Sequence, residues 1–597
     1  MTAGDDRNSW DLEDIYAGEK EWAEALLSVQ ADVDELRSFQ DTLAQEASRL
    51  LACLELHGRA MKEMYRAASY ASMRYHEDTR VGTTAGMEQR AALVATQFSE
   101  AASFIEPEIL SLGADVVDRY LEEEPGLETY RHQLEDVIRR GAHTRSASEE
   151  EIIAAAGLVT EAPSNGYAML ANADAPWPHV TLTDGTEFLL NQAGYSRYRS
   201  APNREDRELV FREFFGVWHR FGRTFGTMLY AQVKRDVFYA RVRRYASSLE
   251  ASLDSDRIPV GVYRTLVDQA NEHLHVLHRY FALRARMMGL EEMRYWDIYP
   301  PLVTGDLEYP IDRGKELVLQ AMKPLGEEAA AAIESGFESR WMDVFPRPGK
   351  KSGAYMNGHV YDVHPYVLMN YNDDYESVST LAHEWGHALH SHLTNGTQHF
   401  VNADYSIFVA EVASTLNEAL LLRRMLEEST TPAERLFYLG HALEQLRGTF
   451  FRQAMFAEFE LAIHERVESG EALTADEFTS LYGALIRRYH GHDAGVVLVD
   501  EAFHVEWAYI PHFYYNFYVY QYATSAAASS YLAERILARE PGATEAYLDL
   551  LRAGGSDYPY DLLVRAGVDL VRPEPYRALM RRMGFIMDEI EALLAET

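Results

Sequence analysis

Cysteine is almost absent from this chain, with Cys53 the only one among 597 residues. A single cysteine excludes an internal disulfide framework and is compatible with a reducing compartment. Basic residues are also scarce: 56 Lys and Arg stand against 93 Asp and Glu, and most of the basic residues are arginine. The resulting net charge of −37 disfavours binding to nucleic acid or to anionic lipid.

Apolar runs long enough to cross a membrane are missing as well. The stretch 512–533 lacks Asp, Glu, Lys and Arg, but its Asn, Gln, Ser and six tyrosines are unlike a membrane helix. We expect this stretch to be a buried helix beside a wet cleft. The first residues, Met1–Tyr16, are acidic and polar, unlike a secretory leader. The sequence therefore predicts a cytoplasmic protein without membrane spans.

The pentapeptide His383-Glu384-Trp385-Gly386-His387 is the most informative feature that is present. Side chains four residues apart on a helix share one face, so two imidazoles in this spacing can bind one tetrahedral ion. A glutamate beside the first histidine can act as general base toward an attacking water. The pattern indicates a zinc-dependent hydrolase. The alternative is a helix that carries two histidines by chance.

The flanking sequence favours a helix that lines a cavity. Asn372, Asp373 and Asp374 offer capping oxygens, and Glu376 follows Asp373 at capping-box spacing. Apolar residues recur at helical intervals up to the end of the run at Asn395-Gly396. We interpret His390 and His392, on the same helix, as hydrogen-bonded or surface histidines rather than ligands.

Two histidines leave a catalytic zinc one protein ligand short. The next helical segment, 406–420, is mostly small or apolar and contains Glu411 and Glu418. A buried, unpaired carboxylate is very costly, so a metal is a natural partner for one of these two residues. The alternative is a salt bridge within a helical bundle.

The segment 511–525 is rich in aromatic residues and contains His512, Tyr515 and Tyr522. Tyrosine and histidine can donate hydrogen bonds to a tetrahedral oxyanion. For most rings of the segment, packing in a core is the simpler interpretation, because a helix points only some side chains at a site.

These motifs together resemble an M3-family zinc metallopeptidase of the oligoendopeptidase F type, a relative of the thimet oligopeptidase and neurolysin group. The resemblance spans residues 10–525 in the order that the family has. The matching stretches are 10–16, 104–110, 352–355, 364–372, 380–390, 408–418 and 510–525.

The resemblance implies one zinc per chain, held by His383, His387 and Glu411, with Glu384 as general base. It places Tyr522 and His512 at the oxyanion and Tyr515 against the substrate. The thimet branch has a glycine-rich stretch between the corresponding histidine and tyrosine, whereas Phe513–Tyr520 is aromatic here. This difference affects the alignment of Tyr515.

The predicted fold is mainly α: a large helical body split by a deep substrate channel, as the resemblance implies, with a small β-sheet or hairpin next to the zinc helix. Residues 1–190 are expected to form an N-terminal helical lobe and 191–597 a catalytic domain. Asp184-Gly185 predicts a small hairpin at 181–189, and Asn357-Gly358 predicts another within 352–372. We interpret 345–352 as an exposed basic loop.

The predicted function is a zinc-dependent oligoendopeptidase that cleaves internal bonds of short unstructured peptides. One alternative is a zinc carboxypeptidase or dipeptidyl carboxypeptidase on a similar scaffold, for which a carboxylate clamp would be needed. A second is a non-catalytic helical peptide-binding protein, against which the intact Glu384 argues. The sequence leaves the cleavage-site preference, the physiological substrate and the oligomeric state open.

Overall fold

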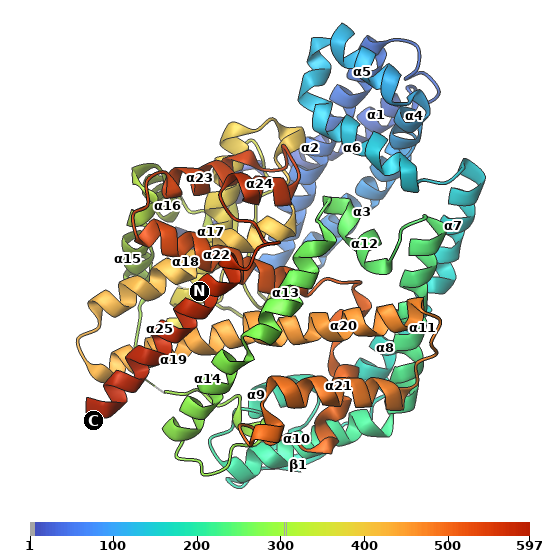
Figure 1. The fold of residues 1–597 in the computed structure, drawn as a ribbon. Helices are drawn as coiled ribbons and strands as arrows, with labels where there is room; N and C mark the ends of the chain where they lie inside the picture. Colours follow the sequence, from blue (N-terminus) through green and yellow to red (C-terminus); the bar gives the residue numbers. More distant parts are fainter. Residues whose placement is uncertain (1–5, 304, 306, 597) are drawn as a thin grey trace. The chain divides into compact units, whose positions relative to one another are not determined.

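The computed structural model describes residues 6–303, 305 and 307–596. The first five residues of the predicted leaderless amino terminus, Met1–Tyr16, lie outside these ranges. Helices dominate the described residues, and the strands are short (Figure 1). This arrangement confirms the predicted mainly α fold. Among the described residues, no helix has both the length and the apolarity needed to cross a membrane.

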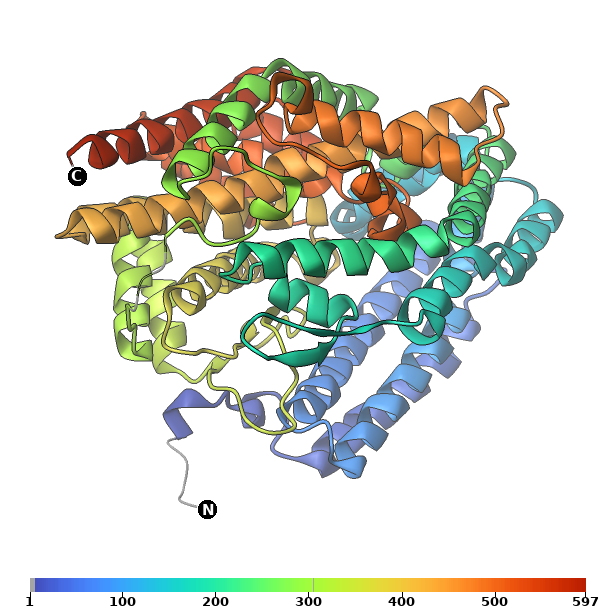
Figure 2. The same ribbon diagram turned by 90° about the horizontal axis from the view of Figure 1, so that it is seen from below.

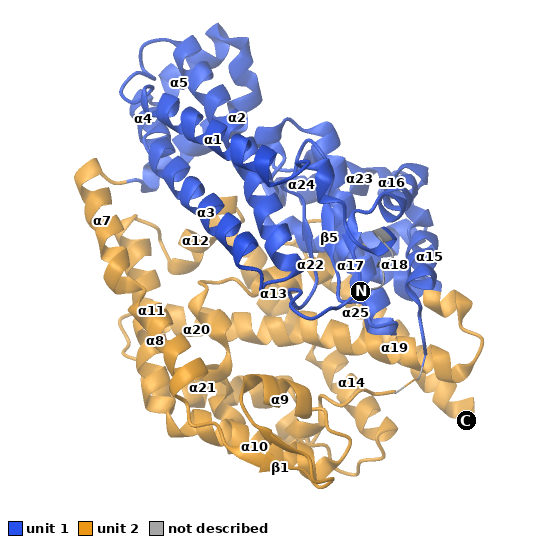
Figure 3. Cartoon of the chain, turned by 180° about the vertical axis from the view of Figure 1, so that it is seen from behind, with its two compact units in different colours: residues 1–144, 307–424, 532–567 blue, residues 145–306, 425–531, 568–597 orange. Residues whose placement is uncertain are grey.

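The chain forms two compact units (Figure 3). Unit 1 comprises 1–144, 307–424 and 532–567, and unit 2 comprises 145–306, 425–531 and 568–597. Each unit is therefore assembled from three separate stretches of sequence. The division into domains 1–190 and 191–597 stays a prediction.

The helices of unit 1 are α1 (Glu19–Arg37), α2 (Ala47–Glu77), α3 (Gly82–Ala102), α4 (Ile105–Leu112), α5 (Ala114–Glu123), α6 (Arg131–Arg140), α15 (Ile311–Ala321), α16 (Glu327–Glu338), α17 (Tyr375–Thr397), most of α18 (Ile407–Glu428), α23 (Ala543–Ala553) and α24 (Pro559–Arg565). Helices α1, α2 and α3 lie side by side (Figures 1 and 2). They bury an apolar core that includes Trp22, Leu50 and Val94.

The helices of unit 2 are α7 (Ala147–Thr160), α8 (Ala162–Met169), α9 (Gln192–Tyr198), α10 (Arg204–Arg220), α11 (Gly222–Val242), α12 (Ser248–Leu253), α13 (Val260–Glu272), α14 (Leu274–Met287), α19 (Pro432–Leu446), α20 (Gln453–Glu468), α21 (Ala475–Tyr489), most of α22 (Tyr520–Leu537) and α25 (Glu574–Glu596). A π-helical turn, Arg447–Arg452, joins α19 to α20. Strands β1 (His179–Thr181) and β2 (Glu187–Leu189) form the first predicted hairpin.

The second predicted hairpin is present with a different connection. Strands β4 (Tyr355–Asn357) and β5 (Tyr366–Leu368) are antiparallel, but residues 358–365 separate them, so Asn357-Gly358 is not a tight turn. A third strand, β3 (Met342–Asp343), pairs in parallel with β5 and was not predicted. The strand order β3-β5-β4 leaves β4 at an edge of the sheet, and α17 packs against β4 and β5.

The prediction that 345–352 forms an exposed loop is wrong for one residue. Lys350 is buried, and its ammonium group binds the Asp343 carboxylate at 2.7 Å. A buried ammonium needs such a partner because an unpaired charge in the protein interior is very costly. Lys350 therefore ties this loop to β3.

Candidate active site

Helix α17 carries both histidines of the motif, and its amino terminus is capped by Asp374. The Asp374 carboxylate accepts the Ser377 backbone N–H at 2.8 Å. Sequence reasoning placed the capping box one residue earlier, at Asp373, but Asp373 has a φ of 57° and precedes the cap. The helix then buries Leu381 and Trp385, and the Trp385 ring contacts Phe337 of α16 at 4.4 Å between centroids.

Gly386 explains how a second helix comes close enough to complete the site. A Cβ atom at this position would lie 2.6 Å from Cα of Ser414 and 2.7 Å from the carbonyl oxygen of Ala413, both on α18. Only glycine permits this approach of two backbones. Asn417 of α18 also donates a hydrogen bond to the carbonyl oxygen of Ala382 at 3.1 Å. These contacts place Glu411 opposite the histidines.

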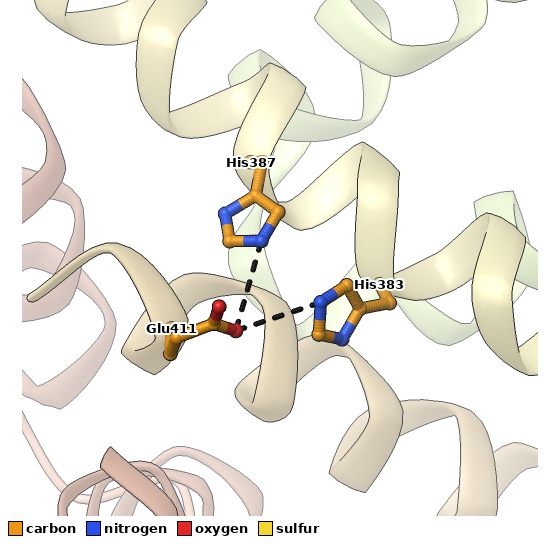
Figure 4. A group of neighbouring side chains, drawn as sticks. All are labelled: His383, His387 and Glu411. Carbon is orange, nitrogen blue, oxygen red and sulfur yellow. Dashed lines mark ion pairs between the residues drawn. The ribbon is translucent and has the colours of Figure 1, made fainter. Parts of the chain in front are cut away.

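His383, His387 and Glu411 each offer one donor atom, and these three atoms lie within 4.8 Å of one another. Both imidazole rings face the Glu411 carboxylate (Figure 4). Oε2 of Glu411 is 3.5 Å from Nε2 of His383 and 3.7 Å from Nε2 of His387. Two ligands of a tetrahedral zinc ion lie about 3.3–3.6 Å apart, given bonds of about 2.0–2.2 Å. The donor set and its spacing therefore fit zinc.

Glu418 lies behind His383. Its Oε1 atom is 2.9 Å from Nδ1 of His383, so Nε2 of that ring is the atom directed at Glu411. Ser414 donates a hydrogen bond to Oε2 of Glu411 at 2.9 Å. Such contacts orient metal-binding side chains and fix the tautomer of a histidine.

The pKa values of the two histidines of the site are shifted in opposite directions. Burial opposes the charge of His383, but the hydrogen bond to Glu418 and the nearby carboxylates raise its pKa to about 9. Burial and the charge of His383 lower the pKa of His387 to about 4. Burial, together with Glu411 and Glu418, raises the pKa of Glu384 to about 7, although His383 opposes this rise.

The interpretation of His390 as a hydrogen-bonded or surface residue is wrong. The ring is 1% exposed, and neither nitrogen has a hydrogen-bond partner among the described residues. It stacks on Tyr405 at 3.6 Å between centroids, and burial lowers its pKa to about 3. His390 is therefore a neutral packing residue. His392 is partly buried beside Trp341.

A cavity of about 450 Å³ in unit 1 adjoins the metal-donor group. His387 and Glu411 line it, together with aromatic and apolar side chains. These side chains are Met61, Tyr65, Met356, Tyr361, Phe400, Val401, Tyr405 and Ile407. A concave, mostly apolar space with a few polar groups is the usual form of a ligand site.

The remaining predicted residues belong to unit 2. His512, Tyr515 and Tyr522 gather around Tyr518, which sequence reasoning missed. The Tyr522 hydroxyl donates to the Tyr518 hydroxyl at 3.2 Å. Tyr515 is 54% exposed. The aromatic composition of 511–525 was the available signal for the fourth ring, without distinguishing it from its neighbours.

The expected single helix over 512–533 is wrong at its beginning. Pro511–Tyr514 forms a 3₁₀ turn, 515–519 is irregular, and α22 begins at Tyr520. Two residues of the irregular part, Asn516 and Phe517, have positive φ angles of 48° and 59°, which no helix contains. His512 and Tyr522 therefore lie on different elements.

Comparison with known proteins identifies the family. Residues 197–582 match the sequence profile of peptidase family M3, and 108–175 match that of oligopeptidase F. Oligopeptidase PepF of Bacillus subtilis is 38% identical over 98% of this chain and 87% of its own length. The sequence and the helical fold thus define a peptidase.

Solved structures agree with this assignment. A Chlamydophila abortus chain of known crystal structure matches with a TM-score of 0.91 at 32% identity, covering 98% of both chains. Oligoendopeptidase-F from Enterococcus faecium matches with a TM-score of 0.75 at 34% identity, covering 97% of this chain and 100% of its own. The chain belongs to peptidase family M3. It is an endopeptidase, as the sequence resemblance predicted.

Proposed function

We propose that this chain is a zinc-dependent oligoendopeptidase of the cytoplasm that hydrolyses internal bonds of short, unstructured peptides. The observation that carries the proposal is the convergence of one donor atom each from His383, His387 and Glu411 within 4.8 Å. Membership of peptidase family M3 supports the reaction class. The deep channel, the domain division and the single zinc per chain are parts of this proposal.

The three donor residues would hold the metal, and Glu418 would keep His383 in the required orientation. When bound, zinc supplies a Lewis acid for the scissile carbonyl and for an attacking water. Glu384 takes a proton from that water on its carboxylate and passes it to the leaving amine nitrogen. Because Glu384 is not a ligand, its removal should spare metal binding.

Two further side chains take part in the proposed mechanism. The Tyr522 hydroxyl and the His512 ring donate hydrogen bonds to the oxyanion as the carbonyl carbon becomes tetrahedral. His512 is half-buried, and burial together with the charge of Arg452 lowers its pKa, so the neutral imidazole, with one N–H donor, is favoured. Tyr515, which is exposed, would contact the substrate.

The peptide substrate would bind by its backbone. Strand β4 lies at the edge of its sheet, and an exposed edge can pair with an extended peptide. The cavity beside His387 and Glu411 offers apolar walls for a side chain. Backbone pairing does not distinguish side chains, so we expect a loose sequence preference. The proposed channel would add a strong preference for short chains.

Digestion of a peptide library with blocked termini tests this function. Products are mapped by mass with and without a chelator, and reduced, denatured casein serves as a long unfolded comparison. We expect internal cuts in short peptides, loss of cleavage with chelator, and slow cleavage per bond in casein. Equal rates per bond in casein contradict the channel. Release of single residues or dipeptides from free carboxyl ends, with blocked peptides uncut, indicates a carboxypeptidase instead.

A further inference from the structure

The irregular segment 515–519 of unit 2 contains two consecutive residues in the left-handed region. Asn516 has a φ of 48° and Phe517 a φ of 59°. Asparagine tolerates this conformation, but for a bulky aromatic residue it is an outlier. Such backbone strain persists only where the surrounding structure holds it in place, and it is concentrated at functional sites.

The surrounding contacts hold both residues. The backbone N–H of Phe517 donates to Oε1 of Glu460 at 2.6 Å, and Ser252 donates to the carbonyl oxygen of Asn516 at 2.8 Å. The Phe517 ring is 1% exposed and contacts His464 at 4.5 Å between centroids. Helix α20, which carries Glu460 and His464, is therefore the support of this turn.

Glu460 is unusual for a buried acid. It is fully buried, and in the part of the chain that the structure describes its second oxygen, Oε2, has no hydrogen-bond partner. Burial raises the pKa of Glu460 to about 7, while His464 and the Phe517 N–H lower it. A carboxyl group in an apolar environment is costly, and a single hydrogen bond offsets only part of that cost. The bond to the strained turn is thus the one polar contact of this side chain that the described residues show.

His464 connects this support to a second helix. Its Nε2 atom is 3.3 Å from Oδ2 of Asp236 on α11, and Asp236 also pairs with Arg235 at 3.1 Å. The other ring nitrogen, Nδ1, faces the carbonyl oxygen of Glu460 at 2.8 Å. The position of Glu460 is therefore fixed by two long helices of unit 2, α11 and α20.

The turn also determines the position of the aromatic cluster. Tyr518 directly follows Phe517, stacks with His512 at 6.3 Å between centroids, and accepts a hydrogen bond from Tyr522 at 3.2 Å. A backbone change at Phe517 would move Tyr518 and, through it, the contacts of both other rings. We propose that Glu460 is a positioning residue that holds the strained Asn516-Phe517 turn, and thereby the His512–Tyr518–Tyr522 cluster, in the conformation used for catalysis.

This inference rests on the proposed roles of His512 and Tyr522. A purely structural Glu460 would affect the stability of unit 2 without changing turnover by the folded enzyme. A positioning Glu460 would instead affect kcat more than KM, because the cluster would act on the transition state. Local hydrogen exchange at the turn provides a second measurement that does not depend on activity.

The experiment compares three variants of the full-length, zinc-loaded enzyme with the wild type. Glu460→Ala removes the acceptor, and we expect kcat to fall roughly 10–100-fold with KM changed less than about threefold, as misplaced catalytic groups do. Glu460→Gln keeps an acceptor oxygen and should stay within about threefold of wild type. Glu458→Ala is the matched control, since this carboxylate of α20 binds Asn271 and Tyr489 instead of the turn.

Relief of the strain provides a rescue test. Glycine adopts positive φ more readily than asparagine does, so Asn516→Gly relieves the part of the strain that lies at this residue, and added to Glu460→Ala it should recover part of the lost kcat. Amide exchange of peptides covering 511–519 should be faster in Glu460→Ala than in wild type, and exchange in α17 should be unchanged. Unchanged exchange in the turn, or a kcat equal to that of wild type, overturns the proposal.

Tyr522→Phe in the same assay tests the proposed oxyanion role separately from the positioning role of Glu460. If Tyr522→Phe leaves kcat unchanged, the proposed oxyanion role fails, whereas the exchange data still decide whether Glu460 holds the turn. If Tyr522→Phe lowers kcat but Glu460→Ala does not, the oxyanion role stands and the positioning role fails. If Glu460→Ala does not fold, Glu460→Gln still tests the proposal, because this variant should be folded and active. An inactive Glu460→Gln with the wild-type melting temperature contradicts the proposal.

Discussion

Oε1 of Glu418 lies 2.9 Å from Nδ1 of His383, while Oε2 of Glu411 lies 3.5 Å from Nε2 of the same ring. The two carboxylates thus occupy opposite sides of one imidazole. A metal on the Nε2 side would make Glu411 a ligand and Glu418 the residue that orients the ring. This difference in position predicts a difference in the effects of their removal.

Glu411→Ala should lower zinc affinity sharply, and Glu418→Ala should lower it more mildly, by roughly 10–100-fold. Titration with a competing chelator measures both affinities. Because Glu418 would act through His383, His383→Ala and the double variant His383→Ala with Glu418→Ala should bind zinc equally weakly. Equal zinc affinity in wild type and Glu411→Ala would reverse the assignment of the third ligand.

Gly386→Ala should separate α17 from α18. The new Cβ would lie 2.6 Å from a backbone atom of Ser414, so a helix must shift, at a cost of about 1–3 kcal/mol in the free energy of unfolding. Zinc affinity should fall with it, because Glu411 moves with α18. Gly396→Ala is the control on the same helix, where no atom of the described residues lies within 4 Å of the added atom, and it should be stabilising by about 0.5–1 kcal/mol. Equal behaviour of the two variants contradicts the close-approach argument.

Tyr522→Phe removes one hydroxyl group and little volume. If that hydroxyl supports the oxyanion, kcat should fall by roughly 10²–10³ with KM little changed. Steady-state kinetics on a blocked fluorogenic peptide measure both constants. Tyr531→Phe, on the same helix α22, serves as a control for the loss of a tyrosine hydroxyl. An unaltered kcat in Tyr522→Phe would leave packing as its role.

Acid should weaken unit 2 through Glu506. Burial opposes the charge of this carboxylate, but Arg452, at 2.8 Å, and hydrogen bonds from Tyr295 and Tyr482 hold its pKa below the ordinary value of 4.5. A lowered folded-state pKa means that the contribution of Glu506 to stability is complete above the unfolded pKa of about 4.5 and is lost as pH falls through the folded value.

Melting temperatures of wild type and Glu506→Gln at pH 7 and pH 4 test this. At pH 7 the variant should be less stable by about 3–5 kcal/mol, because the Arg452 charge is left buried and unpaired. Since the stability of the wild type decreases on the acid side, the difference between the two proteins should shrink as the pH is lowered below 4.5. A difference that is constant or grows would contradict the sign of the pKa shift.

Local patterns were sufficient to predict the helical fold, the β1–β2 hairpin and the family. Spacing along a helix also indicated that His383 and His387 share a face, and both rings face Glu411 in the structure. These features depend on residues close in sequence, for which periodicity and capping chemistry are informative.

Features that depend on distant contacts could not be read from the sequence. Strand β3 is two residues long and pairs with β5 about 25 residues further on, so no periodicity reveals it. Lys350 looks exposed in a Pro- and Gly-rich stretch, but Asp343 provides a buried partner. The positive φ angles of Asn516 and Phe517 break an apparently continuous helix because Glu460, more than fifty residues earlier, supports the turn.

The most direct test of the central claim measures zinc content and turnover together in wild type and Glu384→Gln. Elemental analysis of the purified proteins gives zinc per chain, and hydrolysis of a blocked peptide gives kcat. We predict one zinc per chain in both proteins, with kcat lowered by orders of magnitude in Glu384→Gln and abolished in the wild type by a chelator. Full activity of a chain stripped of metal, or wild-type turnover by Glu384→Gln, would contradict it.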